Sequence, residues 1–96
     1  MGAAARRFLK AVASESRQEV MLLFAGGAEL TVGEVAERLR IGQSTASEQL
    51  APLREGGLLA ARRAGKTVYY RADPDGIAAA LSELQGWLRS CCPPPR

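Results

Sequence analysis

The sequence predicts a mainly α-helical fold that includes one small β-hairpin. Apolar residues recur at helical spacing in five segments, each bounded by capping residues, glycine or proline. Another segment alternates in the manner of strands on both sides of Ala64-Gly65-Lys66, which indicates a hairpin. A chain of 96 residues corresponds to one domain. We assign residues 1–90 to this domain and residues 91–96 to a Cys-Cys-Pro-rich tail.

Three helices are expected in the first part of the chain. Residues 3–13 are rich in alanine and form the first. Ser14 or Ser16 can cap a second helix, which a Gly-Gly pair ends. Thr31 and Glu34 have the T-x-x-E spacing of a capping box, which predicts the start of the third helix.

Two more helices are expected on either side of the hairpin. The fourth covers residues 43–55, and Pro52 inside it removes one helical hydrogen bond and is expected to bend it. The fifth begins after Asp73, with Pro74 at its first helical position. The apolar stripe of the fifth helix consists of Ile77, Leu81, Leu84 and Leu88.

The third and fourth helices, joined by the short turn Arg40-Ile41-Gly42, predict a helix-turn-helix with the hairpin as its wing. The outer face of the fourth helix would enter a DNA major groove, where small hydroxyl residues allow close approach. We predict that base contacts come from this outer face and that phosphate or minor-groove contacts come from basic residues of the wing. The residues predicted to contact bases are Gln43, Ser44, Thr45 and Ser47. The residues predicted to contact the backbone are Arg62, Arg63 and Lys66, with Arg54 as a weaker candidate.

The charge of the chain is unevenly distributed. Residues 36–71 contain seven basic and three acidic side chains, a net charge of +4, whereas the rest of the chain sums to −1. A concentration of positive charge in the predicted DNA-binding segment favours a polyanionic partner.

Composition narrows the classes of function. No stretch approaches the roughly 18 apolar residues of a membrane span, and the N-terminus lacks a long apolar signal core. We therefore expect a cytoplasmic protein without a membrane partner, in which Cys91 and Cys92 are reduced thiols. The chain contains no histidine, and no base lies at a motif spacing from the thiols, so we expect no enzymatic activity. A module that binds proteins rather than DNA is the alternative, because a fold does not fix its use.

Four segments together resemble the ArsR/SmtB family of winged-helix transcriptional repressors. They are FLKAVASESRQEVMLLF (8–24), ELTVGEVAERL (29–39), IGQSTASEQLAPLREGGLL (41–59) and GKTVYYR (65–71). The resemblance implies a homodimer held by the first and last helices, with each recognition helix on one half of an inverted-repeat operator in double-stranded DNA. It also implies release from DNA when a metal, metalloid or oxidant reaches a sensing site.

The chain departs from the family at its known metal sites. The Cys-x-Cys that follows the Glu-Leu pair in the third-helix site is replaced by Thr31-Val32-Gly33. The last-helix site uses Asp and His, and the absence of histidine excludes zinc or nickel sensing through imidazole. Glu48 and Gln49 stand where the family often has histidine.

Cys91 and Cys92 remain as candidate sensors, and they resemble the vicinal cysteines of the arsenic-sensing branch. Thiolate is a soft ligand that suits trivalent arsenic, antimony or a soft metal ion, and no other cofactor is required. Two protein thiols would complete a monomethylated arsenic, whereas inorganic arsenite would need a third from a small thiol or the other subunit. Oxidation of the pair and a passive tail are the alternatives.

Overall fold

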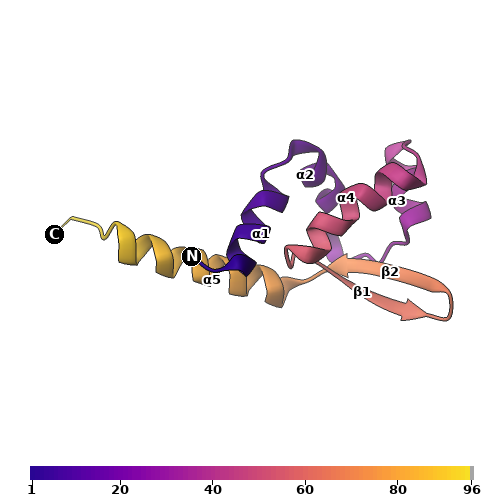
Figure 1. Cartoon of the computed structure of the whole chain (residues 1–96). Helices are drawn as coiled ribbons and strands as arrows, with labels where there is room; N and C mark the ends of the chain where they lie inside the picture. Colours follow the sequence, from indigo (N-terminus) through magenta and orange to yellow (C-terminus); the bar gives the residue numbers. More distant parts are fainter. Residues whose placement is uncertain (96) are drawn as a thin grey trace.

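The computed structural model describes residues 1–95. Figure 1 shows α1 to α4 gathered into a helical head, with the hairpin at one end and α5 extending from the other. The longest dimension of the molecule is 52 Å, about twice the other two, which are 25 and 24 Å. The elements are α1 (Ala3–Val12), α2 (Glu15–Leu22), the 3-10 turn η1 (Ala25–Gly27), α3 (Val32–Leu39), α4 (Gln43–Glu55), β1 (Leu59–Ala64), β2 (Thr67–Ala72) and α5 (Pro74–Cys91). The predicted mainly α-helical fold with one hairpin is confirmed.

The predicted helix caps are present. The Ser14 hydroxyl accepts a hydrogen bond of 3.3 Å from a backbone N–H in the first turn of α2. The Thr31 hydroxyl accepts one of 3.1 Å from the backbone N–H of Glu34, whose carboxylate accepts one of 3.0 Å from the backbone N–H of Thr31. Asp73 caps α5 by accepting a bond of 3.1 Å from a backbone N–H one turn on. These bonds satisfy N–H groups that a helix start leaves without partners.

The core lies between the four helices of the head and the start of β1. Three side chains of α4, Ala46, Leu50 and Leu53, are fully buried and fix the inner face of that helix. The α4 helix continues past Pro52 to Glu55. The other buried apolar residues packed with them are Phe8, Ala11, Val20, Phe24, Leu30, Val35, Ala36, Leu58, Leu59 and Ala80.

The strands β1 and β2 pair antiparallel and place Arg62 opposite Tyr69 and Arg63 opposite Val68. The alternating pattern predicts strands over residues 59–63 and 67–71, and each strand ends one residue later because the ladder includes the pairs Ala64–Thr67 and Leu59–Ala72. An isolated bridge joins the segment before α3 to the wing through two backbone hydrogen bonds between Leu30 and Tyr70, of 2.9 and 2.8 Å. This bridge fixes the wing beside the helix-turn-helix.

Two backbone positions shape the junctions of the head. Arg40, which follows α3, has a φ of 56°, the left-handed conformation that glycine adopts more readily. Gly56, which follows α4, lies so near α1 that a Cβ there would be 2.9 Å from the carbonyl oxygen of Arg7. A side chain at position 56 would therefore push α1 away from the end of α4.

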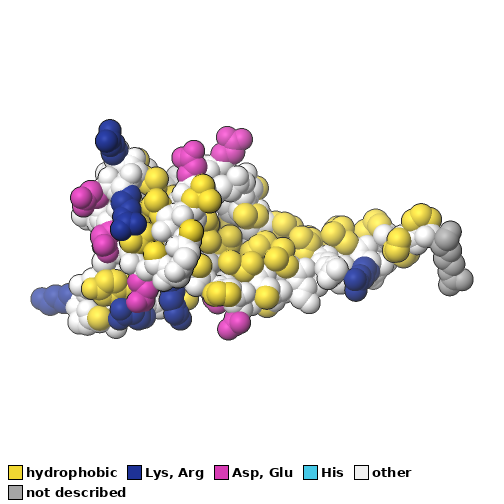
Figure 2. Space-filling model, turned by 180° about the vertical axis from the view of Figure 1, so that it is seen from behind, with side chains coloured by type: hydrophobic (Ala, Val, Ile, Leu, Met, Phe, Trp, Pro, Cys, Tyr) yellow, Lys and Arg dark blue, Asp and Glu magenta, His cyan; other side chains and the backbone are white. Residues whose placement is uncertain are grey.

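Helix α5 leaves most of its apolar side chains uncovered. Leu81, Trp87 and Leu88 are 49%, 40% and 46% exposed, and Ala80 is the only residue of α5 that is buried. Figure 2 shows apolar side chains along the projecting helix and on the adjoining face of the head. Within residues 1–95, no helix is long and apolar enough to cross a membrane.

Candidate nucleic-acid interface and cysteine pair

The packing of α3 against α4 exposes one side of α4. The inner side of α4 is fixed by Ala46, Leu50 and Leu53, which are buried. Successive helical residues are about 100° apart, so Ser44 and Glu48 lie opposite this inner side. The exposed ridge of α4 therefore presents short hydroxyl groups and one carboxylate.

The four residues predicted to contact bases are all exposed, but they do not share one direction. Ser44 lies on the ridge, while Gln43 and Ser47 lie toward α3 and the wing; the Gln43 amide nitrogen is 3.4 Å from the position of a Cβ on Gly33. Thr45 lies toward α2 instead and lines a cavity of about 210 Å³ with Gln49. Three of the four are thus grouped, and Thr45 stands apart.

Glu48 belongs to the exposed ridge although it was not among the predicted contact residues. Its side chain is exposed one helical turn from Ser44. A carboxylate can accept a hydrogen bond from the amino group of cytosine, but it repels phosphate. The helical periodicity of α4 was the sequence signal that could have identified it.

Arg62 and Arg63 are neighbours in sequence but face opposite sides of the wing, because side chains of a strand alternate. Arg62 donates two hydrogen bonds, of 2.7 and 3.1 Å, to the carboxylate of Glu29. Its guanidinium also lies 4.6 Å from the ring centroid of Tyr69. The hydrogen bond from Arg62 lowers the pKa of Glu29 below its ordinary value. Arg62 therefore has partners within the protein.

Arg63 lines a concavity of about 280 Å³ with Arg54 of α4, Val68 of β2 and its β1 neighbours Ala61 and Arg62. Lys66 is exposed in the turn between the strands. Within the described part of the chain, the one ion pair formed is that between Arg62 and Glu29, so the other three cations are not neutralised by an acid. The wing and α4 together present a basic groove at this place.

A second basic concavity, of about 370 Å³, lies on the α1 and α2 side of α4. The linear charge count did not identify it, because its cations lie outside residues 36–71 and come together only when α1 packs on α4. The residues that line it are Arg7, Lys10, Ala11, Arg17, Pro52 and Glu55.

The sulfur atoms of Cys91 and Cys92 are bonded to each other at the exposed end of α5. The expectation of reduced thiols is therefore not met in this structure, which has the oxidised pair. The helix ends between the two cysteines: Cys91 is its last residue, and Cys92 has φ −142° and ψ 68°. This break brings the two sulfur atoms together. No cluster of three or more His, Cys, Asp or Glu residues that could hold a metal ion occurs in residues 1–95.

Comparison with known proteins identifies the class. The model of a family described as a helix-turn-helix domain matches residues 12–62. The chain is 37% identical over 76 residues to the transcriptional activator HlyU of Vibrio cholerae, a match that covers 79% of this chain and 69% of the relative. It is 42% identical over 66 residues to the arsenic resistance transcriptional regulator ArsR1 of Pseudomonas putida, which covers 69% of this chain and 52% of the relative. The chain thus spans about half the length of the Pseudomonas regulator.

Solved structures agree with these matches. The homodimeric winged helix-turn-helix DNA-binding domain from Mycobacterium bovis has a TM-score of 0.70 and 30% identity, with 93% of this chain and 82% of that chain covered. Reduced HlyU from Vibrio cholerae has a TM-score of 0.65 and 33% identity, with 94% of this chain and 90% of that chain covered. Fold and sequence together define a winged helix-turn-helix regulator and not an enzyme. The chain belongs to the ArsR family of winged-helix transcriptional regulators.

Proposed function

We propose that this chain is a dimeric DNA-binding repressor that leaves its operator when a thiophilic inducer binds Cys91 and Cys92. The observation that supports this most is the placement of two adjoining sulfur atoms at the end of α5, the helix whose apolar side is uncovered. An inducer bound there would change the end of the helix on which the dimer depends.

The DNA contacts are assigned to one side of the head. Ser44, Ser47 and Gln43 enter the major groove, and the operator is an inverted repeat because a two-fold dimer presents two equal recognition helices. Arg63, Lys66 and, more weakly, Arg54 contact the phosphate backbone. Of the predicted basic contacts, Arg62 is assigned to holding the wing through Glu29.

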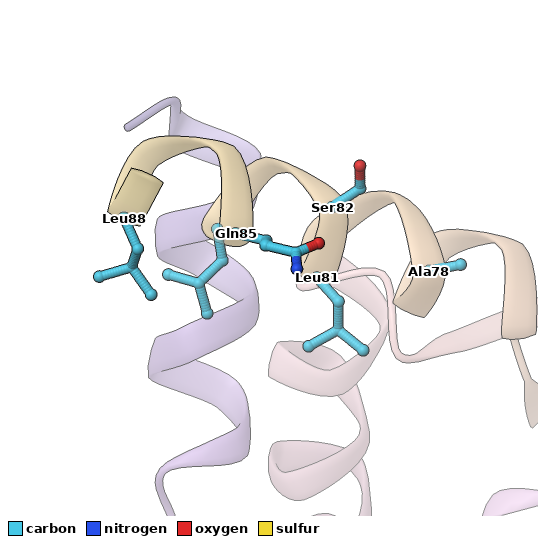
Figure 3. A pocket seen from close by; sticks show the side chains of 6 residues that line it. Ala78, Leu81, Ser82, Gln85 and Leu88 are labelled. Atoms are coloured by element: carbon cyan, nitrogen blue, oxygen red, sulfur yellow. The ribbon is translucent and has the colours of Figure 1, made fainter. Parts of the chain in front are cut away.

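The dimer is assigned to α5 together with α1. A shallow groove of about 480 Å³ runs along α5, and in Figure 3 Leu81 and Leu88 point to the same side of that helix. An apolar groove on a projecting helix is the kind of surface that a second copy covers in a two-fold interface. The Mycobacterium bovis relative is described as homodimeric. The residues that line the groove are Ala78, Leu81, Ser82, Leu84, Gln85 and Leu88.

The inducer is assigned to trivalent arsenic or antimony, or to a soft metal ion. Reduction of the Cys91–Cys92 bond gives two thiols that are near enough to bind one centre, and thiolates prefer soft ions. A monomethylated arsenic needs only these two sulfur ligands. Inorganic arsenite takes a third sulfur ligand from a small thiol or from the partner subunit. Two relatives from Pseudomonas putida are named arsenic resistance regulators.

The experiment is a DNA titration of the reduced protein by fluorescence anisotropy, with and without trivalent methylarsenic. Wild type should bind the operator tightly and lose affinity when the arsenical is added. A double Cys91→Ser and Cys92→Ser variant should bind equally well and keep its affinity with the arsenical. Release of that variant by the arsenical would contradict the assignment of the cysteines.

A redox switch is the second candidate, favoured by the bond between Cys91 and Cys92 in this structure. Here the two thiols lose two electrons and two protons to a peroxide or a reactive sulfur species and form the disulfide. Wild type treated with peroxide would then release DNA, and a dithiol reductant would restore binding. If the arsenical has no effect on DNA binding while peroxide releases the DNA, the redox switch is the function of the cysteine pair.

A further inference from the structure

We propose that Arg7 and Lys10 of α1 bind the phosphate backbone of the DNA on the side of α4 that is away from the wing. This inference rests on the proposed DNA binding and adds a second backbone site to it. The ligand is the phosphodiester backbone of the same duplex whose groove receives α4.

The two side chains lie one helical turn apart on α1 and are both exposed. They line the second basic concavity with Arg17 of α2 and with Pro52 and Glu55 of α4. Three cations and one carboxylate give this concavity a net charge of +2. Neither Arg7 nor Lys10 forms an ion pair within residues 1–95, since the described ion pair involves Arg62 and Glu29.

The backbone beneath both cations is fixed in place. The missing side chain of Gly56 lets the carbonyl of Arg7 come close to the end of α4. Arg17 donates a bond of 2.7 Å from Nε to the carbonyl of Ala11 and one of 2.9 Å from Nη2 to the carbonyl of Lys10. Arg17 thereby completes the C-terminal end of α1, where a cation is favoured, and is a positioning residue. Within residues 1–95, the side chains of Arg7 and Lys10 form no such bonds and remain available.

The placement fits the shape of duplex DNA. A major groove about 12 Å wide is bordered by two phosphate strands, so a helix inserted in it has one strand on each side. Arg54 and Arg63 lie on the wing side of α4, and Arg7 and Lys10 lie on the α1 side. The C-terminal turn of α4 therefore stands between two basic clusters, one for each strand. The carboxylate of Glu55 lowers the net charge of the second basic concavity but leaves it positive.

The test is the salt dependence of binding to a duplex of unrelated sequence, measured by anisotropy with the full chain. Arg7→Gln with Lys10→Gln removes both proposed contacts. Arg6→Gln with Arg89→Gln is the matched control, because Arg6 lies on α1 but does not line the concavity, and Arg89 lies near the end of α5. Each lost phosphate contact should reduce the slope of log affinity against log salt by about 0.9. The test variant should thus lose about 2 in slope per bound protomer, and the control should retain the wild-type slope.

A test variant with the same slope as the control overturns the proposal. If the double variant does not fold or dimerise, Arg7→Gln and Lys10→Gln are measured singly, and each should reduce the slope by about 1. This assay needs neither operator nor inducer, so failure of operator recognition or of arsenic release leaves its result unaffected. A wild type that binds no duplex refutes the proposed function itself, and this inference with it.

Discussion

The helix-turn-helix head and the α5 end of this molecule differ in how far the chain covers its own apolar side chains. In α3 and α4, Val35, Ala46 and Leu53 are fully buried. In α5, Leu81 and Leu88 are close to half exposed. The head thus has a complete core within one chain, whereas the α5 end has an apolar side that a second chain would cover. Leu22 of α2, which is 74% exposed, is the exception in the head.

This difference assigns DNA contact to the head and the pairing of two chains to α5 in the proposed function. The geometry that would meet DNA is set by packing inside one protomer, so it is in place before any partner arrives. In the proposed dimer, by contrast, the spacing of the two recognition helices depends on α5, and Cys91 and Cys92 lie at the end of that helix. Under the proposed function, a change at the cysteines would alter the dimer without unfolding the head.

The largest effect is expected from Leu84→Glu, which places a charge in the apolar groove of α5. Sedimentation should show monomer or unfolded chain, and operator affinity should fall about 100-fold or more because two linked half-site contacts become one. The matched control is Leu22→Glu, at an exposed leucine of the head, which should remain dimeric. A folded, dimeric Leu84→Glu protein would place the interface elsewhere.

The next largest effect on DNA affinity is expected in the wing. The two faces of the wing should respond differently to substitution. Replacing Arg63 and Lys66 with alanine should weaken all duplexes about equally and reduce the salt slope by about 2 per protomer. Arg62→Ala should change the slope less, because Arg62 is bound to Glu29. Glu29→Gln should strengthen DNA binding by releasing the Arg62 charge. Equal slopes for the single variants Arg62→Ala and Arg63→Ala would show that the ion pair does not survive on DNA.

A smaller effect is expected on the recognition helix. Ser44→Ala and Ser47→Ala should each cost about 1 kcal/mol on the operator, roughly a fivefold loss, and little on unrelated DNA. Thr45→Ala should cost less, because Thr45 lies toward α2. Competition titrations with both duplexes measure this difference. A Thr45 variant that loses as much specificity as the Ser44 variant would mean that α4 enters the groove in another orientation.

The smallest effect is expected at the turn between α3 and α4. Arg40 has a φ of 56°, and glycine adopts this conformation without the strain of a side chain. Arg40→Gly should raise the free energy of unfolding by about 0.5 kcal/mol, measured by urea denaturation, with the dimer unchanged. A marked destabilisation would show that the Arg40 side chain makes contacts that outweigh its backbone strain.

Local signals in the sequence predicted most of this fold. The capping box at Thr31, the proline that begins α5 and the alternation around Gly65 each depend on residues a few positions apart, and the structure has all of them. They sufficed for the helix-turn-helix with its wing, and they gave the ends of α1 and of the strands to within one residue.

The parts that the sequence did not predict depend on contacts between distant segments. Arg62 and Glu29 are 33 residues apart and meet only because β2 pairs with the segment before α3. Thr45 lies toward α2 because of the packing of α4, not because of its own residue type. The cluster of Arg7 and Lys10 forms only when α1 lies against the end of α4. A count of charges along the chain cannot reveal such groupings.

Cys91 and Cys92 are proposed to act as one unit that controls DNA affinity from the end of α5. The most direct measurement is operator affinity of reduced wild type, Cys91→Ser and Cys92→Ser, each with and without trivalent methylarsenic. We predict that the arsenical weakens wild type by about 5- to 150-fold, a coupling of about 1–3 kcal/mol, and has no effect on either single variant. Without arsenical, all three should bind equally. If the arsenical weakens operator binding by either single variant as much as it weakens binding by wild type, the claim is contradicted.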